Sequence, residues 1–355
     1  MAIPPFAGPP RSRLRSRSGP RRLLGGVLAL LALAAAAAVL LVIVPSGHGT
    51  AHAHARARSA VPAPAAPALS PAGLPLASPS FPLIGLATPA QDPVRVRFHS
   101  PPRAGLLFNL SDGRVLWQRN ALARLPIASL TKLMTALIAV ESAPARAHVL
   151  VTPQAIATNG SKVGELPLGH HVDMESLLYG LMLPSGNDAA VAIAQHVSGS
   201  VAAFVARMNQ RAAQLGLGCT RFSSPHGFYD AGNFSCAADL AAIAHAALAQ
   251  PRIARIARTA VAVIPFPIKG GKLYLSNNNP LLIYGYPGTT GLKTGYTIAA
   301  GRCLLATAER HGVRLGVVLL NSPAPATQAR VLLDDAFARV YHQRRVPEPP
   351  IPSTA

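Results

Sequence analysis

The sequence contains few acidic residues and few lysines. Its 355 residues include 13 Asp and Glu against 33 Lys and Arg, which gives a formal net charge of +20. No acidic residue precedes Asp92, and only five of the 33 basic residues are Lys. Because Arg stays protonated in proteins while a Lys can be made to release its proton, each Lys is a candidate for chemistry.

Cysteines and aromatic residues are also scarce. The cysteines, Cys219, Cys236 and Cys303, are too few for a disulfide-stapled small protein and lack metal-binding spacing. We expect them to be free, small apolar residues, with one disulfide as the alternative in an exported chain. Aromatic residues make up 5% of the chain and form no cluster with basic residues, which argues against a nucleic-acid partner. Half of the residues are apolar, which excludes a chain that is disordered throughout.

The N-terminal part of the chain has the pattern of an export signal. Residues 1–22 form a basic segment with six Arg, and residues 23–44 contain no charge and are long enough to span a bilayer. Since basic flanks stay in the cytoplasm, the chain after residue 44 is expected to be exported to the cell envelope. Residues 23–44 are either a retained anchor in the cytoplasmic membrane or a signal removed near Ala53, which would release a secreted or periplasmic protein.

Composition divides the rest of the chain into a linker, one domain and a tail. Residues 45–93 are rich in Pro, Ala and Ser and are predicted to form an extended linker. Its histidines, His48, His52 and His54, are interpreted as solvated rather than metal-binding. Residues 94–343 have the periodic patterns of a folded domain, and residues 344–355 form a short tail with no room for a second C-terminal domain.

Hydrophobic periodicity predicts strands at both ends of this domain and helices between them. The predicted strands cover residues 104–110, 115–118, 292–297, 302–308 and 313–321. The predicted helices cover residues 130–138, 201–215, 237–248 and 326–342. This order favours an α+β fold with one antiparallel sheet.

One motif pairs a hydroxyl with one of the five lysines. Ser129 and Lys132 are three residues apart at the start of a predicted helix, so they share a face. A neutral Lys in a dry site can take a proton from Ser and make it a nucleophile. By itself, the spacing is more typical of a helix cap followed by a surface Lys.

Two further motifs combine small and polar residues. Ser185-Gly186-Asn187 follows Pro184 and an apolar stretch, a composition that is also typical of an ordinary turn. The Lys-Thr-Gly run at residues 293–295 lies in a predicted strand, where Gly permits the close approach of another backbone, such as that of a substrate. By itself, this run also fits a strand end with an exposed Lys.

The order Ser-x-x-Lys, Ser-x-Asn, Lys-Thr-Gly is that of the penicillin-recognising serine enzymes. Over most of its folded domain the chain resembles the serine D-alanyl-D-alanine carboxypeptidases of peptidase family S11, the low-molecular-mass penicillin-binding proteins. The matching segments cover residues 125–135, 177–190, 224–227 and 291–297. The resemblance implies the α+β fold of penicillin-binding proteins and β-lactamases, an antiparallel sheet with a helical subdomain.

The resemblance also implies a role for each matching residue. Ser129 would be the acylated nucleophile, Lys132 its general base and Ser185 a participant in proton transfer. The substrate would be bound by Asn187, Lys293, Thr294, Gly295 and Arg314. Of these, Lys293, Thr294 and Arg314 would bind its terminal carboxylate. The backbone N–H groups of Ser129 and Tyr296 would form the oxyanion hole.

The implied substrate is the stem pentapeptide of peptidoglycan. Ser129 would attack the penultimate D-Ala carbonyl, D-Ala would leave, and water would hydrolyse the acyl-enzyme. β-Lactams resemble the acyl-D-Ala-D-Ala end and would acylate Ser129. The reaction needs no metal or cofactor. Relatives often add a C-terminal domain and an amphipathic membrane helix, so their lack here favours residues 23–44 as the anchor.

Three alternatives share parts of this pattern. A class A β-lactamase has the same motifs, but Gly186 stands where that class has Asp, and no Glu lies between Asp188 and Lys293. A catalytically silent envelope-binding protein would be expected to lose Ser129 or Lys132. A D,D-endopeptidase that cuts cross-links has the same motifs, and the sequence does not separate it from a carboxypeptidase.

Other conspicuous residues have ordinary interpretations. His226 lies in a matching segment, but a Ser–Lys mechanism needs no histidine, so we expect it to be structural. The basic residues Arg252, Arg255 and Arg258 are expected to form a solvated helix face that could attract anionic envelope polymers or lipid headgroups.

Overall fold

The computed structural model describes residues 81–228 and 232–345. The chain divides into two units after Pro62, and all described residues belong to the second unit. The basic segment, the apolar segment 23–44, the three linker histidines and most of the tail lie outside the described residues.

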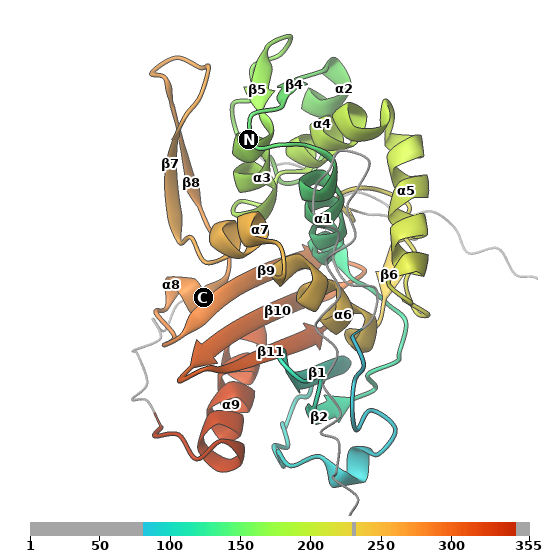
Figure 1. Cartoon of the computed structure of the whole chain (residues 1–355), viewed down its shortest axis with the longest axis vertical. Coiled ribbons are helices and arrows are strands. Elements are labelled where there is room, and N and C mark those ends of the chain that lie inside the picture. Colours follow the sequence, from blue (N-terminus) through green and yellow to red (C-terminus); the bar gives the residue numbers. More distant parts are fainter. Residues whose placement is uncertain (1–80, 229–231, 346–355) are drawn as a thin grey trace, which may run out of the picture. The chain divides into compact units, whose positions relative to one another are not determined.

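A five-stranded antiparallel sheet forms the centre of this unit (Figure 1). Its strands are β1 (Ala104–Asn109), β2 (Val115–Arg119), β9 (Thr289–Thr297), β10 (Gly301–Arg310) and β11 (Val313–Leu320). The strand order is β2-β1-β11-β10-β9, so the N-terminal hairpin joins the C-terminal strands through the pairing of β1 with β11. All five strands agree with the prediction from the sequence, and β9 lies at the sheet edge.

Helices cover both faces of the sheet (Figure 1). Adjacent residues of a strand face opposite sides. On β1, Leu106 packs in the core cluster that contains α1 (Lys132–Ser142) and α6 (Ala237–Leu248), while Leu107 packs in the cluster under α9 (Pro325–Asp335). The helix predicted over residues 326–342 is therefore α9, followed by a π-helical turn (η3, Ala336–Val340).

Most of the remaining helices form a subdomain beside the sheet, namely α2 (Pro153–Ile156), α3 (Met174–Met182), α4 (Asn187–Ser198), α5 (Val201–Gln214) and α7 (Pro251–Ala257). The short helix α8 (Pro280–Ile283) instead contacts β9 and α9. No helix was predicted over the residues of α3 and α4, which include the apolar stretch before Pro184 and the end of the predicted turn at residues 185–187. The first eight residues of α4 are all buried, and only its last turn reaches the surface.

Three short strand pairs complete the described structure. They are β3 (Leu125–Pro126) with β6 (Phe234–Ser235), β4 (His148–Leu150) with β5 (His171–Asp173), and β7 (Val261–Pro265) with β8 (Lys272–Ser276). The first pair matters most for the site, because it lies beside the loop that precedes α6.

The central helix of the subdomain is α1. Every residue of α1 except Ser142 is buried. It contacts α3, α4, α5, α6 and α7. A buried, two-pronged ion pair ties it to α5: Arg211 donates to Glu141 from Nη2 to Oε1 at 2.7 Å and from Nε to Oε2 at 3.1 Å. This packing fixes the start of α1 against the sheet edge.

Residues before the predicted domain start also pack on it. The Phe81 ring stacks on the His245 ring, with centroids 4.2 Å apart, and meets the Phe108 ring edge-on. The Asp92 carboxylate accepts a hydrogen bond from the Gln118 backbone N–H at 2.9 Å. The last residues of the predicted linker thus contribute to the fold.

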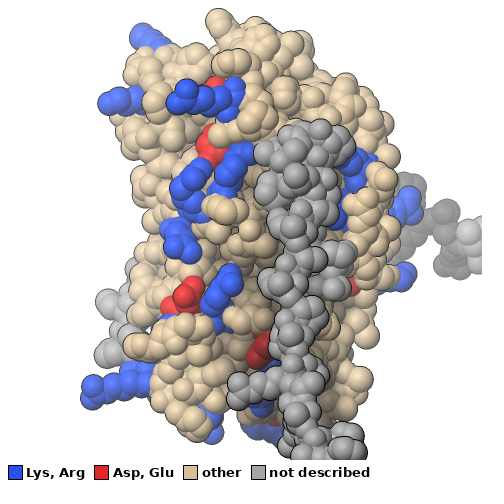
Figure 2. All heavy atoms as spheres, viewed as in Figure 1, with Lys and Arg blue, Asp and Glu red and all other residues tan. Residues whose placement is uncertain are grey.

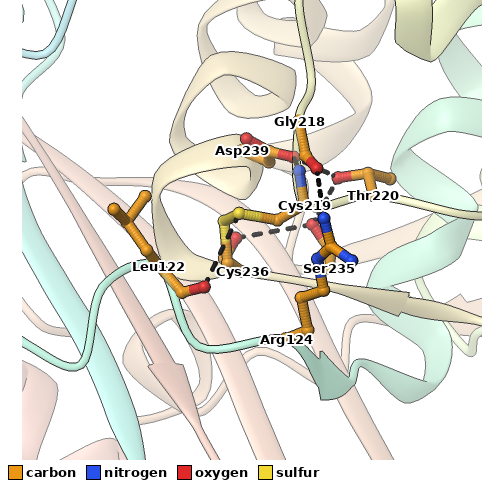
Figure 3. Close-up of a disulfide and its surroundings, with 8 residues drawn as sticks. All are labelled: Leu122, Arg124, Gly218, Cys219, Thr220, Ser235, Cys236 and Asp239. Carbon is orange, nitrogen blue, oxygen red and sulfur yellow. Dashed lines mark hydrogen bonds between the residues drawn. A yellow bond between two sulfur atoms is a disulfide. The ribbon is translucent and has the colours of Figure 1, made fainter. Parts of the chain in front are cut away.

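A disulfide joins Cys219 to Cys236 (Figure 3). The prediction that these two cysteines are free was therefore wrong, and of the described cysteines only Cys303 is free. Backbone pairing explains the bond. Arg221 and Phe234 exchange both backbone hydrogen bonds, at 2.9 and 3.0 Å, and the two cysteines lie two positions further along the same antiparallel register. The linear spacing did not reveal this pairing.

The arginines of α7 do not form the solvated face that we expected. Arg252 donates to a Glu175 carboxylate oxygen at 2.9 Å and to the Ala143 carbonyl at 2.7 Å. Arg255 pairs with the other oxygen of the same carboxylate. These two side chains connect α7 to α3 through Glu175. Arg258 is exposed, as expected from the sequence.

No single helix within the described ranges is long and apolar enough to cross a bilayer. The consecutive helices α4 and α5 reach the required length and composition only as a pair, and they are bent by 84° relative to each other.

Candidate active site

The three sequence motifs meet where β9 passes the start of α1 (Figure 1). Ser129 lies in a 3-10 turn (η2, Ala128–Thr131) that leads directly into α1. Ser185 lies in the turn between α3 and α4, and Lys293 lies in β9. The fold thus brings together residues that are more than 160 positions apart in the chain.

Lys132 is the centre of this arrangement. Its Nζ donates to Ser129 Oγ at 2.9 Å and to Asn187 Oδ1 at 2.7 Å. It also donates to the His226 backbone carbonyl at 3.0 Å. The side chain is completely buried. The hypothesis of a helix cap with a surface lysine is therefore wrong for this motif.

Burial lowers the pKa of Lys132 well below the usual range of a lysine. The positive charge of Lys293 lowers this pKa further, and the carboxylate of Asp188 acts in the opposite direction. A lysine with such a pKa can be present as the neutral amine, which has a lone pair to accept the Ser129 proton.

Asn187 is held by a loop that the sequence analysis did not single out. Its backbone N–H donates to the Ser161 carbonyl at 2.7 Å, and its Nδ2 donates to the Asn159 carbonyl at 2.6 Å. Gly160 lies between these two acceptors at φ +88°, and a Cβ there would come within 2.5 Å of Asn187 Nδ2. The loop therefore orients Asn187 Oδ1 toward Lys132.

Ser185 occupies an unusual backbone conformation, with φ +71°. A residue with a side chain in this region costs of order 1–3 kcal/mol and is typical of functional sites. Its Oγ is buried and has no hydrogen-bond partner among the residues that the structure describes. Because a buried hydroxyl without a partner is unfavourable, this oxygen is suited to a substrate or a transferred proton.

Gly295 brings β9 close to the Ser129 turn. A Cβ on this residue would lie 3.0 Å from both the Ile127 carbonyl oxygen and the Ser129 backbone nitrogen. The sequence suggested that this glycine admits another backbone, and in the structure the backbone it admits is that of the turn carrying Ser129. The next residue, Tyr296, is 66% exposed.

Lys293 is a second buried lysine in the site. It is 1% exposed, and its Nζ donates to the Thr294 carbonyl at 3.2 Å. Burial lowers its pKa to about 7. The alternative of a strand end with an exposed Lys is therefore wrong, and this side chain can exchange a proton near neutral pH.

A cleft of about 450 Å³ opens along the edge of β9. Residues of all three motifs line it, namely Ser129, Ser185, Thr294 and Gly295, and Tyr296 lines it as well. Its described lining also contains Arg302 and no Asp or Glu. The cleft is therefore a place where a peptide and an anionic group can approach Ser129.

The structure does not bring Arg314 to this cleft. Arg314 lies on β11 opposite Glu309 of β10, and its Nε is 3.9 Å from Glu309 Oε2. Thr294 of β9 lies opposite Leu304, five residues before Glu309 on β10. At about 3.3 Å per residue, Arg314 is roughly 16 Å further along the sheet than Thr294, and two strands away. The prediction for Arg314 rested on the short run of residues 312–315, which lies at the hairpin turn between β10 and β11.

The side chain of His226 does not touch Ser129 in any described contact. Its Nδ1 accepts a hydrogen bond from the Phe228 backbone N–H at 3.1 Å. Its backbone carbonyl, rather than its ring, binds Lys132. This agrees with the structural role expected from the sequence.

A single group of metal-ligating residue types comes together within the described ranges. It consists of Cys219, Cys236 and Asp239, and both sulfur atoms belong to the disulfide (Figure 3). The Asp239 carboxylate accepts hydrogen bonds from the Cys219 backbone N–H and the Thr220 hydroxyl, both at 2.7 Å. These residues fasten the loop before α6.

Known proteins identify the family. The profile of peptidase S11, described as D-alanyl-D-alanine carboxypeptidase, matches residues 99–324. The chain belongs to the peptidase S11 family. This confirms the membership that the motifs predicted.

Curated members of the S11 family align with much of the chain. It is 34% identical over 245 residues to the D-alanyl-D-alanine carboxypeptidase DacF of Bacillus subtilis, covering 67% of this chain and 62% of that protein. It is 36% identical over 246 residues to DacB2 of Mycobacterium tuberculosis, covering 67% of this chain and 83% of that protein. The chain thus spans less than two thirds of the first relative and most of the second.

A solved structure confirms the fold. The DD-transpeptidase of Streptomyces K15 superimposes with a TM-score of 0.64 at 30% identity, covering 69% of this chain and all of that one. The α+β fold of penicillin-binding proteins predicted from the sequence is therefore correct.

Proposed function

We propose that this protein is a serine D-alanyl-D-alanine carboxypeptidase that removes the terminal D-Ala from peptidoglycan stem peptides. One observation carries the proposal: Nζ of the fully buried Lys132 lies 2.9 Å from Ser129 Oγ, in a cleft that a peptide can enter. The geometry suits transfer of the hydroxyl proton to the amine, which is the first requirement of a serine nucleophile.

The acylation step follows from these positions. As Ser129 Oγ attacks the penultimate D-Ala carbonyl carbon, its proton passes to the neutral Lys132 amine. The carbonyl oxygen gains negative charge, which the backbone N–H groups of Ser129 and Tyr296 would stabilise. The β9 strand is suited to this because it is a sheet edge, and edge strands leave backbone groups unpaired.

Collapse of the tetrahedral intermediate breaks the C–N bond and releases D-Ala. The leaving amine needs a proton, and the Ser185 hydroxyl is suited to pass it from Lys132, because its Oγ has no other described partner. Water then attacks the Ser129 ester, and the same groups act in reverse.

Asn187 has two tasks in this scheme. Its Oδ1 accepts from Lys132 and so holds the amine beside Ser129. One Nδ2 hydrogen is bound by the Asn159 carbonyl, which leaves the second for the substrate amide. Thr294 and Gly295 line the opposite side of the cleft, where they would contact the end of the peptide.

The site of action would be the cell envelope. The Cys219–Cys236 disulfide supports this location, because disulfides persist in exported proteins. In this proposal residues 23–44 either anchor the protein in the cytoplasmic membrane or are removed near Ala53. The N-terminal sequence of the protein recovered from its host membrane fraction decides between the two.

Release of D-Ala from a stem pentapeptide tests the proposed activity, with Ser129→Ala as the inactive control. The proposal predicts D-Ala release by the full chain, inhibition by penicillin, and slow turnover of penicillin itself. Rapid penicillin hydrolysis without D-Ala release would instead indicate a β-lactamase. Cleavage of a cross-linked muropeptide dimer in preference to the pentapeptide would indicate an endopeptidase. The absence of both activities would indicate a catalytically silent binding protein.

A further inference from the structure

One arginine, Arg302, lies in the wall of the cleft. It is on β10 opposite Tyr296 of β9. Paired residues of antiparallel strands share a face, and so do residues two apart on one strand, so Arg302 projects from the same face as Thr294. Diagonal neighbours of this kind are about 7–8 Å apart, a distance that a long arginine side chain can span.

The charge of Arg302 is not neutralised by any carboxylate in the described ranges. Its Nη1 donates to the Pro323 carbonyl at 3.3 Å, which fixes the side chain at the loop before α9. An arginine has five N–H donors, so most remain available. Among described residues it is the one cationic side chain in the cleft wall, and that wall has no acidic residue.

The other cations near Ser129 are less suited to bind an anion. Lys132 and Lys293 are buried behind the cleft wall, and the burial that lowers the pKa of Lys293 to about 7 also makes its charge depend on pH near neutrality. Arg314 is far along the sheet beside Glu309. An exposed guanidinium keeps its charge and matches a carboxylate with two parallel hydrogen bonds.

We propose that Arg302, with the Thr294 hydroxyl, binds the terminal carboxylate of the acyl-D-Ala-D-Ala substrate and so restricts the enzyme to free C-terminal peptides. This assignment rests on the proposed carboxypeptidase function and replaces Arg314 as the carboxylate-binding arginine. The same guanidinium binds the carboxylate of a penicillin before Ser129 is acylated.

The test compares Arg302→Leu, Arg302→Lys and Arg314→Leu in the full chain. Each variant is assayed on a diacylated Lys-D-Ala-D-Ala peptide and on the same peptide with a C-terminal amide. Acylation by benzylpenicillin and by its methyl ester is measured in parallel. Because Arg302 is exposed and lacks an ion pair with a described residue, thermal unfolding of its variants should match that of the wild type.

We expect Arg302→Leu to lower kcat/KM for the free acid about 10- to 100-fold, the range for lost hydrogen bonds between charged groups, while the amide is unaffected. The wild-type preference for acid over amide then disappears. Arg302→Lys should recover part of it, and Arg314→Leu should keep all of it. Benzylpenicillin should lose acylation rate in Arg302→Leu, and its methyl ester should not.

Two results would overturn the assignment. In the first, Arg302→Leu retains the wild-type preference for the free acid. In the second, Arg314→Leu loses that preference while Arg302→Leu keeps it. Failure of the proposed function gives a different result: the wild type would neither release D-Ala nor be acylated by benzylpenicillin. The role of Arg302 would then be wrong as well.

Discussion

Two buried lysines, Lys132 and Lys293, give the site its chemistry at the scale of single residues. Both side chains are almost entirely removed from water, and burial lowers the pKa of both. The pKa of Lys132 is lowered further by the positive charge of Lys293, which opposes the protonation of Lys132. A pair of this kind favours one neutral amine next to Ser129.

Replacing Lys132 by Arg tests whether the amine acts as a base or only as a positive charge. Lys132→Arg retains a cation but cannot accept a proton near neutral pH. We expect acylation of Ser129 by benzylpenicillin to fall by about 10²- to 10⁴-fold, the usual contribution of general base catalysis. Lys272→Arg, at an exposed position of β8, is the control and should react like the wild type. Retained acylation in Lys132→Arg would mean that Lys132 is not the base.

The pH dependence of acylation tests the coupling of the two lysines. Only neutral Lys132 accepts a proton, so the acylation rate should rise as pH rises through its lowered pKa. Lys293→Gln removes a positive neighbour, which raises the pKa of Lys132 and moves this rise to higher pH. Second-order acylation rate constants measured across the pH range check this. A rise that stays in place or moves to lower pH would contradict the coupling.

Much of the site could be predicted from single residues, but not all of it. Only five of the 33 basic residues are lysines, which made Lys132 and Lys293 conspicuous, and both lie in the site. With 28 arginines, no such scarcity separates one from another. Choosing between Arg302 and Arg314 required the register of β9 on β10, which the sequence does not state.

At the scale of elements, the position of α1 decides whether Ser129 and Lys132 face the cleft. The Glu141–Arg211 ion pair holds the far end of α1 against α5, and both side chains are at most 8% exposed. We expect Glu141→Gln to lower the free energy of unfolding by about 3 kcal/mol, because it removes the negative charge from a buried ion pair.

A matched exposed pair serves as the control for this prediction. Glu309 and Arg314 are 45% and 43% exposed and their charged atoms are 3.9 Å apart. Glu309→Gln should therefore change the free energy of unfolding by less than about 1 kcal/mol. Urea unfolding of both variants gives the comparison. Equal small changes would show that the Glu141 pair contributes nothing to the stability of α1.

The disulfide secures a second element, the loop between Cys219 and Cys236. This loop carries His226, whose carbonyl accepts a hydrogen bond from Lys132. For a sequence separation of 17, the loss of the cross-link is expected to cost about 3 kcal/mol. Reduction should therefore lower both the unfolding temperature and the acylation rate.

A variant that lacks both cysteines provides the control for reduction. Cys219→Ser with Cys236→Ser should have the lower unfolding temperature from the start and should not respond to a reducing agent. Scanning calorimetry with and without dithiothreitol measures this. An unfolding temperature that reduction leaves unchanged in the wild type would contradict the role of the disulfide.

Strands were easier to predict than the buried helices. The five strands of the main sheet alternate or run apolar between clear turns, and all were found. The helix α3 does carry a helical period, because Met174, Leu177, Leu178, Leu181 and Met182 are buried along one face, and this signal was missed. The disulfide was missed because a backbone pairing between Arg221 and Phe234, and not a sequence pattern, brings the sulfurs together.

At the scale of the whole molecule, the net charge of +20 has several separate sources. Six arginines belong to the N-terminal segment, outside the described residues. In the described domain, Arg211, Arg252 and Arg255 are tied to carboxylates. Figure 2 shows Lys and Arg in several separate groups on the visible face. Among the basic residues that the structure describes, Arg302 is the one that lines the cleft, which gives part of the charge a local use.

We expect Ser129 to be the residue that is acylated. The most direct test is mass spectrometry of the full chain after reaction with benzylpenicillin, followed by peptide mapping. We expect one penicillin per chain, on the peptide that contains Ser129, and no adduct in Ser129→Ala. An unmodified wild-type protein, or an adduct that persists in Ser129→Ala, would contradict it.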